Sequence, residues 1–336
     1  MSPIIGSFAS GSAFGAKGGK PPLSGLYDFT DAQFVANKYG REAPTLTECR
    51  NAISSPSGGN ISWKDDTSFF NVSTGIQYWT VPYTATYRFE AWGAIGRNGR
   101  SGSGGYGSRM RGDFDLTEGE IIRFLIGQWP QHAGVYGPPN PYGGGGSGGT
   151  FVTKSPYNTN ASILLVAGGG SGGARGSYPG AHATTSSTTP SGPPAGNGGG
   201  QSNQHGGSGG GGFFGDGPQS RPNTFFGLGG RSWTNGGRGG VGSQAYGNPG
   251  NQAPAAVYGE GGFGGGGGCD HQGGGGGGYT GARYANYSTG SSLPSCSYNN
   301  GSNQLNYSGG QTVAQQDRPS GGLSTNGGQL RISLIL

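Results

Sequence analysis

Cys269, Asp270 and His271 bring a thiol, a carboxylate and an imidazole into consecutive positions. These residue types can bind a metal ion or activate a nucleophile. The local pattern lacks a second histidine at ligand spacing and a base beside the thiol. The four histidines are scattered through expected loops: His132, His182, His205 and His271. We therefore interpret the cluster as part of a surface loop.

Four carboxylates gather around an expected hairpin turn: Asp113, Asp115, Glu118 and Glu120. Carboxylate oxygens are the ligands that Ca²⁺ prefers, so a calcium site is one interpretation. A solvated hairpin turn accounts for the same residues, and we favour it. Short glycine motifs of the nucleotide-binding kind occur by chance in so glycine-rich a chain, and none opens a helix after a strand or precedes a Walker lysine. The sequence predicts a protein that is not an enzyme and has no cofactor or metal.

Aromatic side chains in glycine-rich loops are the stronger functional signal. Tyrosine among Ser, Gly and Asn is typical of adaptable recognition loops, and aromatic faces beside amides also suit sugars. The alternative is that the rings pack on the glycine tracts. The residues expected to face a receptor are Trp129, Tyr136, Tyr142, Tyr279, Tyr284, Tyr287, Tyr298 and Tyr307.

Composition narrows the classes of protein further. The formal net charge is +5, but the 20 basic residues form no cluster, which argues against nucleic-acid binding. Three cysteines without a CxxC spacing indicate neither a disulfide scaffold nor a zinc site, although one pair plus one free thiol stays open. Met1–Ala16 lacks the basic head and apolar core of a signal peptide, and no apolar run reaches membrane-spanning length.

The elements that would position these residues are mostly strands. Alternating or strongly apolar runs predict strands at Gly75–Tyr83, Thr86–Trp92, Arg109–Leu116, Ile121–Ile126, Ile163–Ala167 and Gln329–Leu336. Pro44–Ile53 predicts a short helix, with Thr45 as its N-cap and Glu48 as the partner in a capping box. We expect the last strand to join the sheet that holds Ile121–Ile126 and Ile163–Ala167.

Glycine accounts for 81 of the 336 residues, and it is concentrated in tracts such as Gly143–Gly146, Gly209–Gly212, Gly264–Gly268 and Gly273–Gly278. Uninterrupted glycine can form an extended threefold helix, the counterpart of polyproline II, and several such helices can hydrogen-bond side by side. A flexible linker is the alternative. The expected fold is all-β, an antiparallel jelly roll of residues 23–170 closed by residues 329–336, with a polyglycine-helix insert at residues 171–328.

Residues 1–22 are rich in Gly, Ser and Ala. A frayed tail is one interpretation, and an extended arm that docks on a partner is the other. The apolar side chains available for docking are Ile4, Ile5, Phe8 and Phe14.

Several segments together resemble the glycine-rich domain of the anaplastic lymphoma kinase and leukocyte tyrosine kinase receptors. They are Trp79–Pro82, Tyr87–Ala94, Gly112–Glu120, Ile126–Gln128, Gly143–Val152 and Leu165–Gly170. This resemblance implies a tumour-necrosis-factor-like jelly roll with an inserted polyglycine helix bundle. It spans about Tyr27 to Leu336, is most specific before Gly170, and is mainly compositional afterwards. The chain departs from those receptors in having no kinase, membrane span or leader.

Other segments look like glycine-rich virion proteins of tailed marine phages: Ile5–Ser12, Leu26–Ala32, Trp63–Asn71 and Ser155–Ser162. The tip adhesins of T-even-type phages are similar in their polyglycine sandwiches but not in their strands. This resemblance implies a virion structural protein of the tail or baseplate fibre, assembled in the host cytoplasm. Its expected partners are itself in a homotrimer, other virion proteins, and a host surface glycan or protein.

Two alternatives remain open at this stage. One is a capsid or neck decoration protein without a receptor role. The other is a receptor-like extracellular ligand-binding module.

Overall fold

The computed structural model describes residues 25–131, 143–200, 206–220, 228–242, 259–269, 271–284, 292–311 and 325–335. Their regular structure is almost entirely antiparallel β-sheet, which confirms the all-β prediction. Some of the residues predicted to be functional lie outside these ranges: Ile4, Ile5, Phe8, Phe14, Tyr136, Tyr142 and Tyr287. So do Asp270 and two of the histidines, His132 and His205.

One sheet, sheet A, contains five strands in the order β2-β1-β11-β5-β6. They are β1 (Asp31–Val35), β2 (Ile53–Ser54), β5 (Ala85–Trp92), β6 (Arg109–Leu116) and β11 (Gln329–Ile335). The expected closing strand is thus present as β11, and it lies between β1 and β5.

The prediction that this closing strand joins the sheet of Ile121–Ile126 and Ile163–Ala167 was wrong. The runs beginning at Ile121 and Ile163 form β7 and β9, which belong to the other sheet. Each of these strands already has a partner on both edges, so neither offers free backbone groups to β11. In sheet A, by contrast, β11 hydrogen-bonds to β1 and β5 and fills the space between them.

The second sheet, sheet B, has the order β10-β9-β8-β7-β4-β3. Its strands are β3 (Phe70–Ser73), β4 (Ile76–Thr80), β7 (Ile121–Leu125), β8 (Thr150–Thr153), β9 (Ile163–Ala167) and β10 (Tyr298–Asn299). The predicted helix is α1 (Leu46–Asn51), and its Thr45–Glu48 capping box is present. Within the described ranges there are also three short 3-10 helices: η1 (Ser62–Asp65), η2 (Asn160–Ser162) and η3 (Trp233–Asn235).

The two sheets pack face to face around an aromatic core. Phe34 of β1 meets Phe124 of β7 edge-on, with ring centroids 4.8 Å apart. Trp79 of β4 meets Phe89 of β5 in the same way at 6.3 Å. Along β4 and β7 every second residue is buried in this core, and the residues between them point to the other face of sheet B.

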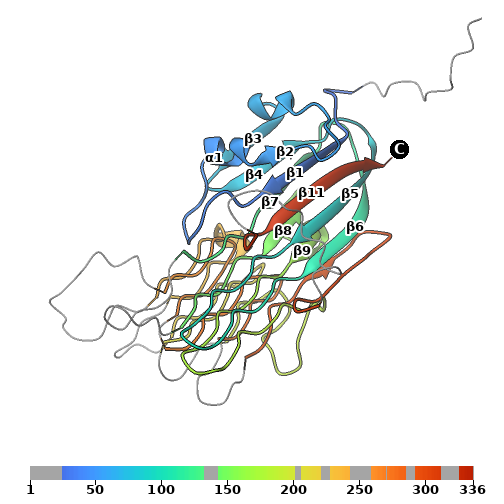
Figure 1. Ribbon diagram of the computed structural model, residues 1–336. Coiled ribbons are helices and arrows are strands. Elements are labelled where there is room, and N and C mark those ends of the chain that lie inside the picture. The colour runs from blue at the N-terminus through green and yellow to red at the C-terminus, as the bar shows by residue number, and fades with distance from the viewer. Residues whose placement is uncertain are drawn as a thin grey trace, which may run out of the picture.

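The glycine tracts lie together against part of that other face. Figure 1 shows them as a set of nearly parallel, non-strand segments below the sheets. Leu125, Phe151 and Val166 from sheet B pack there against Phe213 and Trp233 from the long insert. We call this region the glycine core; it comprises the described residues of 93–107, 143–149, 168–183, 196–200, 206–242 and 259–284.

Backbone hydrogen bonds link the tracts to one another. Gly146 N–H donates to Gly267 O at 3.0 Å, and Gly267 N–H donates to Gly275 O at 2.8 Å. Gly172 N–H donates to Gly274 O at 2.9 Å. A methyl group at Gly172 would lie 1.8 Å from Gly144 O. At such positions the segments are too close for a side chain, and only glycine permits this packing.

Candidate functional site

Segment 292–311 carries Tyr298 and Tyr307, and we call it the tyrosine segment; it lies along the free edge of β6. Tyr307 N–H donates to Arg109 O at 2.8 Å, Leu305 N–H to Arg111 O at 3.1 Å, and Ser302 N–H to Asp113 O at 3.0 Å. At its other end β10 pairs with β9 of sheet B. The segment thus connects the two sheets at one edge of the sandwich.

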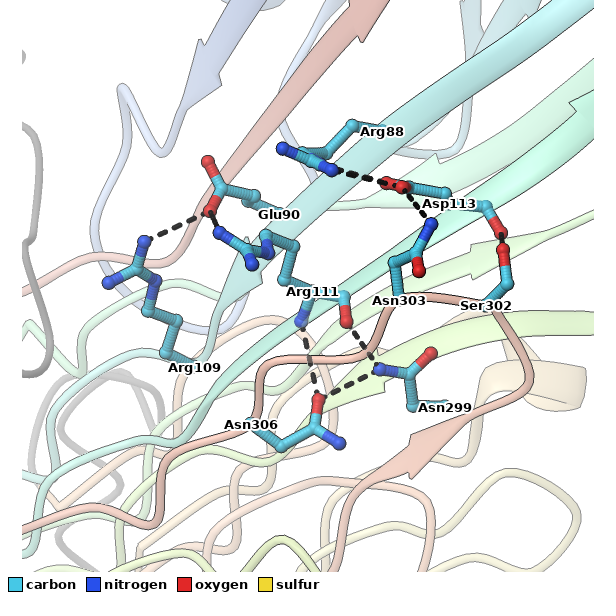
Figure 2. A network of polar contacts seen from close by, with 9 residues as sticks. All are labelled: Arg88, Glu90, Arg109, Arg111, Asp113, Asn299, Ser302, Asn303 and Asn306. Atoms are coloured by element: carbon cyan, nitrogen blue, oxygen red, sulfur yellow. Dashed lines mark hydrogen bonds and ion pairs between the residues drawn. The ribbon is translucent and has the colours of Figure 1, made fainter. Parts of the chain in front are cut away.

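Polar side chains reinforce this connection (Figure 2). The Arg88 guanidinium binds the Asp113 carboxylate through two bonds, Nε to Oδ1 at 2.8 Å and Nη2 to Oδ2 at 2.9 Å. Asn303 adds a bond from Nδ2 to Asp113 Oδ2 at 3.1 Å. The hydrogen bond from Arg88 is the main reason that the pKa of Asp113 is lowered, with Asn303 contributing.

A second part of the network joins Glu90 to two arginines. Arg109 Nη2 lies 2.9 Å from Glu90 Oε1, and Arg111 Nη1 lies 4.0 Å from the same oxygen. The Arg109 guanidinium also stacks between Trp92 and Tyr307, at 5.2 and 5.7 Å from the ring centroids. Arg109 therefore links β6 to Tyr307, and the network holds segment 292–311 in place.

The tyrosines predicted to face a receptor differ in how deeply they are buried. Tyr279 and Tyr284 are each only 4% exposed, so the expectation that they face a receptor is wrong in this structure. Tyr279 belongs to the same buried cluster as Phe213 and Trp233, and Tyr284 lies against Gly207. Tyr298 packs on Tyr279, with ring centroids 4.8 Å apart, and Tyr307 packs on Arg109. The alternative, that the rings pack on the glycine tracts, describes Tyr279 and Tyr284 better, whereas Tyr298 and Tyr307 are half-buried against other side chains.

Trp129 lies at a different corner, beside the glycine core. Arg97 stacks on its ring at 4.6 Å, and Tyr39 meets it edge-on at 5.7 Å. Arg97 Nη1 also donates to Gln131 O at 2.8 Å. Trp129 remains partly exposed, so it is still a candidate contact residue. The structure does not bring it together with the tyrosine segment.

A buried carboxyl group lies close to this corner. Glu260 is 6% exposed, and burial raises its pKa to about 7 in spite of the positive charge of Arg41. Gly40 leaves space for it, because a methyl group at Gly40 would lie 2.5 Å from Glu260 Oε1. The charge of Glu260 therefore changes near neutral pH.

The carboxylates near the hairpin turn do not gather around a common point. Asp113 is bound by Arg88, Asp115 accepts a hydrogen bond from Thr86 Oγ1 at 2.5 Å, and Glu120 accepts one from Thr117 N–H at 3.3 Å. In the part of the chain that the structure describes, no group of three or more His, Cys, Asp or Glu residues could hold a metal ion.

The three thiols are buried and unpaired with one another. Burial raises the pKa of Cys49 and of Cys296 to about 12. Cys269 donates to Gly143 O at 3.1 Å. Protonated, buried thiols are poor nucleophiles, so Cys49 and Cys296 are not activated cysteines. The possibility of one disulfide pair is not realised.

The sequence did not predict one further candidate binding surface. Thr67, Ser68, Phe69, Asn71, Ser73, Tyr78, Thr80 and Ile121 line a depression of about 200 Å³ on the outer face of sheet B. The alternation of Ile76, Tyr78 and Thr80 placed these residues on one face, but it did not show which face the glycine core leaves open.

No model of a known protein family matches the chain. None of the helices among the described residues is long and apolar enough to cross a membrane.

Proposed function

We propose that the two sheets form a jelly roll and that the glycine core is a bundle of polyglycine helices. The jelly roll is supported by the position of β11 between β1 and β5, which requires a long crossing connection. The bundle is supported by the lateral bonds between tracts, since a threefold glycine helix has no internal hydrogen bonds and must find partners in its neighbours.

We further propose that the chain is a virion structural protein of a tailed phage, in the tail or baseplate fibre, that takes part in host attachment. The glycine core carries this proposal. Close-packed peptide groups that hydrogen-bond laterally form a stiff body, which suits the display of loops outside a cell.

Two assembly features belong to the same proposal. Residues 1–22 dock the protein on the particle through their apolar side chains, and the sandwich forms a closed cyclic trimer. The partners are then other copies of this chain, the neighbouring virion proteins, and a glycan or protein on the host surface.

Gold labelling of purified particles tests the location. Antibodies against the chain should mark the tail tip or baseplate, and a phage lacking residues 2–20 of the protein should lose the label. Label on the capsid or neck would favour the decoration protein instead. Particles that carry no label would refute a place in the virion.

A further inference from the structure

The depression on sheet B is built on one row of side chains that crosses three strands. Asn71 of β3 lies opposite Tyr78 of β4, and Tyr78 lies opposite Arg123 of β7. Residues in register on neighbouring strands point to the same face. Because Trp79 and Ile122 fill the aromatic core on the inner side, this row faces outward.

The Tyr78 ring is held in place by a cation between two rings. The Arg123 guanidinium lies 4.8 Å from the centroid of Tyr78 and 3.7 Å from that of Tyr157. Tyr157 has a backbone φ of 73°, which bulky residues rarely adopt. Its hydroxyl donates to Ile121 O at 3.1 Å, which anchors it to β7. Tyr78 is therefore an ordered aromatic surface at the edge of the depression.

Uncharged polar groups surround this ring. The Thr67, Ser68 and Ser73 hydroxyls and the Asn71 amide nitrogen are exposed and, among the described residues, make no hydrogen bond to the protein. Thr80 Oγ1 donates to Ser68 O at 2.8 Å, which fixes the loop that carries Thr67 and Ser68. The lining contains donors and acceptors but no Lys, Arg, Asp or Glu.

We propose that this depression binds a neutral saccharide. A sugar ring presents C–H groups on its faces and hydroxyls around its edge, so it can stack on Tyr78 while its hydroxyls bond to Asn71, Ser68 and Ser73. The volume of about 200 Å³ is below the roughly 300–1,000 Å³ of sites that enclose drug-sized ligands, so one terminal ring fits. Ile121, which is 42% exposed, adds an apolar side chain to the lining of the depression.

The uncharged lining argues against two other ligand classes. A phosphate or nucleic acid requires cations that reach it, and Arg123 is occupied between the two rings. A divalent metal ion requires carboxylates, which the lining lacks. This inference rests on the proposed function only for the origin of the sugar, a host surface glycan; the binding itself is a property of the depression.

Saturation-transfer NMR on the full chain tests the binding. The probes are methyl α-mannoside, methyl β-galactoside, methyl β-glucoside and N-acetylglucosamine, with glucuronate as a charged comparison. We expect at least one neutral probe to receive saturation. Tyr78→Ala should weaken its binding by about tenfold or more, the factor that corresponds to ~1.4 kcal/mol, whereas Tyr78→Phe, which keeps the ring, should retain most of it. Asn71→Ala should weaken it as well.

Tyr178→Ala is the matched control, because Tyr178 is 36% exposed but does not line the depression. Thermal unfolding of each variant verifies that it is folded. Transfer to none of the four neutral probes, or equal binding by the wild type and a folded Tyr78→Ala variant, would overturn the inference. Host attachment is measured separately, by competition for phage adsorption, so the two proposals can fail independently.

Discussion

Arg88 and Asp113 lie directly opposite each other on β5 and β6 and form a two-point ion pair, while Asp113 also accepts a bond from Asn303 of segment 292–311. The Asp113 side chain is 2% exposed and that of Arg88 is 37% exposed. The carboxylate therefore connects two strands and the tyrosine segment at one point.

Asp113→Ala should lower the free energy of unfolding by about 2–3 kcal/mol, because it removes the buried partner of a charged hydrogen bond and releases segment 292–311. Asp115→Ala, on the same strand but exposed and bonded to Thr86, should cost less than about 1 kcal/mol. Urea unfolding of both variants provides the comparison. Equal losses would show that the network in Figure 2 does not hold the segment.

Gly199 and Gly200 are neighbours with opposite surroundings, so they form a matched pair for the glycine core. A methyl group at Gly199 would lie 1.8 Å from Ala282 O, whereas at Gly200 its nearest neighbour is the flexible Arg283 side chain at 3.5 Å. Gly199→Ala should cost more than about 3 kcal/mol or prevent folding. Gly200→Ala should be neutral or stabilising by up to about 1 kcal/mol. Similar melting temperatures for the two variants would contradict the close packing of these tracts.

Glu260 should make stability depend on pH. Since burial raises its pKa to about 7 in the folded protein, the folded state keeps the proton that the unfolded chain loses near its usual value of 4.5. This contribution to stability is complete below pH 4.5 and is lost as the pH rises through 7. Its full size is on the order of 3 kcal/mol, at about 1.4 kcal/mol for each unit of pKa.

Glu260→Gln keeps the shape of the side chain without its charge, so it should stabilise the protein at pH 8 and have little effect at pH 4.5. The difference between variant and wild type isolates this group from His182, whose pKa is lowered by burial and whose effect has the opposite sign. The free energy of unfolding of the variant and of the wild type, measured at pH 4.5 and at pH 8, tests this prediction. A difference that does not change with pH would show that folding does not raise the pKa of Glu260.

The thiols provide a fourth prediction. Cys49, Cys269 and Cys296 are 6%, 1% and 0% exposed. A thiol reagent such as Ellman's should therefore label none of them at pH 8 in the native protein and all of them in guanidinium chloride. Rapid labelling of the native protein would show that the regions around these residues open readily.

Local patterns predicted the strands and the helix well. The two-residue alternation that defines β4, β7 and β11, and the Thr45–Glu48 capping box, are interactions between residues close in the sequence. The sheet that receives β11 depends instead on which strands have free edges, and that is a property of the assembled fold. The sequence pattern carried no information about it.

The candidate site was harder to predict for a similar reason. Tyr279 and Tyr284 have the composition of recognition loops around them, yet both rings are buried. Tyr78 appeared only as one residue of an amphipathic strand. Its exposure depends on where the glycine core stops covering sheet B, and glycine tracts do not reveal from their sequence which surface they cover.

Competition for adsorption tests host attachment most directly. Purified protein is added to cells of the susceptible host before the phage, and free phage are counted. We predict that adsorption falls as the protein concentration rises and that heat-denatured protein has no effect. Unchanged adsorption at saturating protein, with gold label on the particle, would contradict a role in attachment and leave a structural component whose glycine core serves stability.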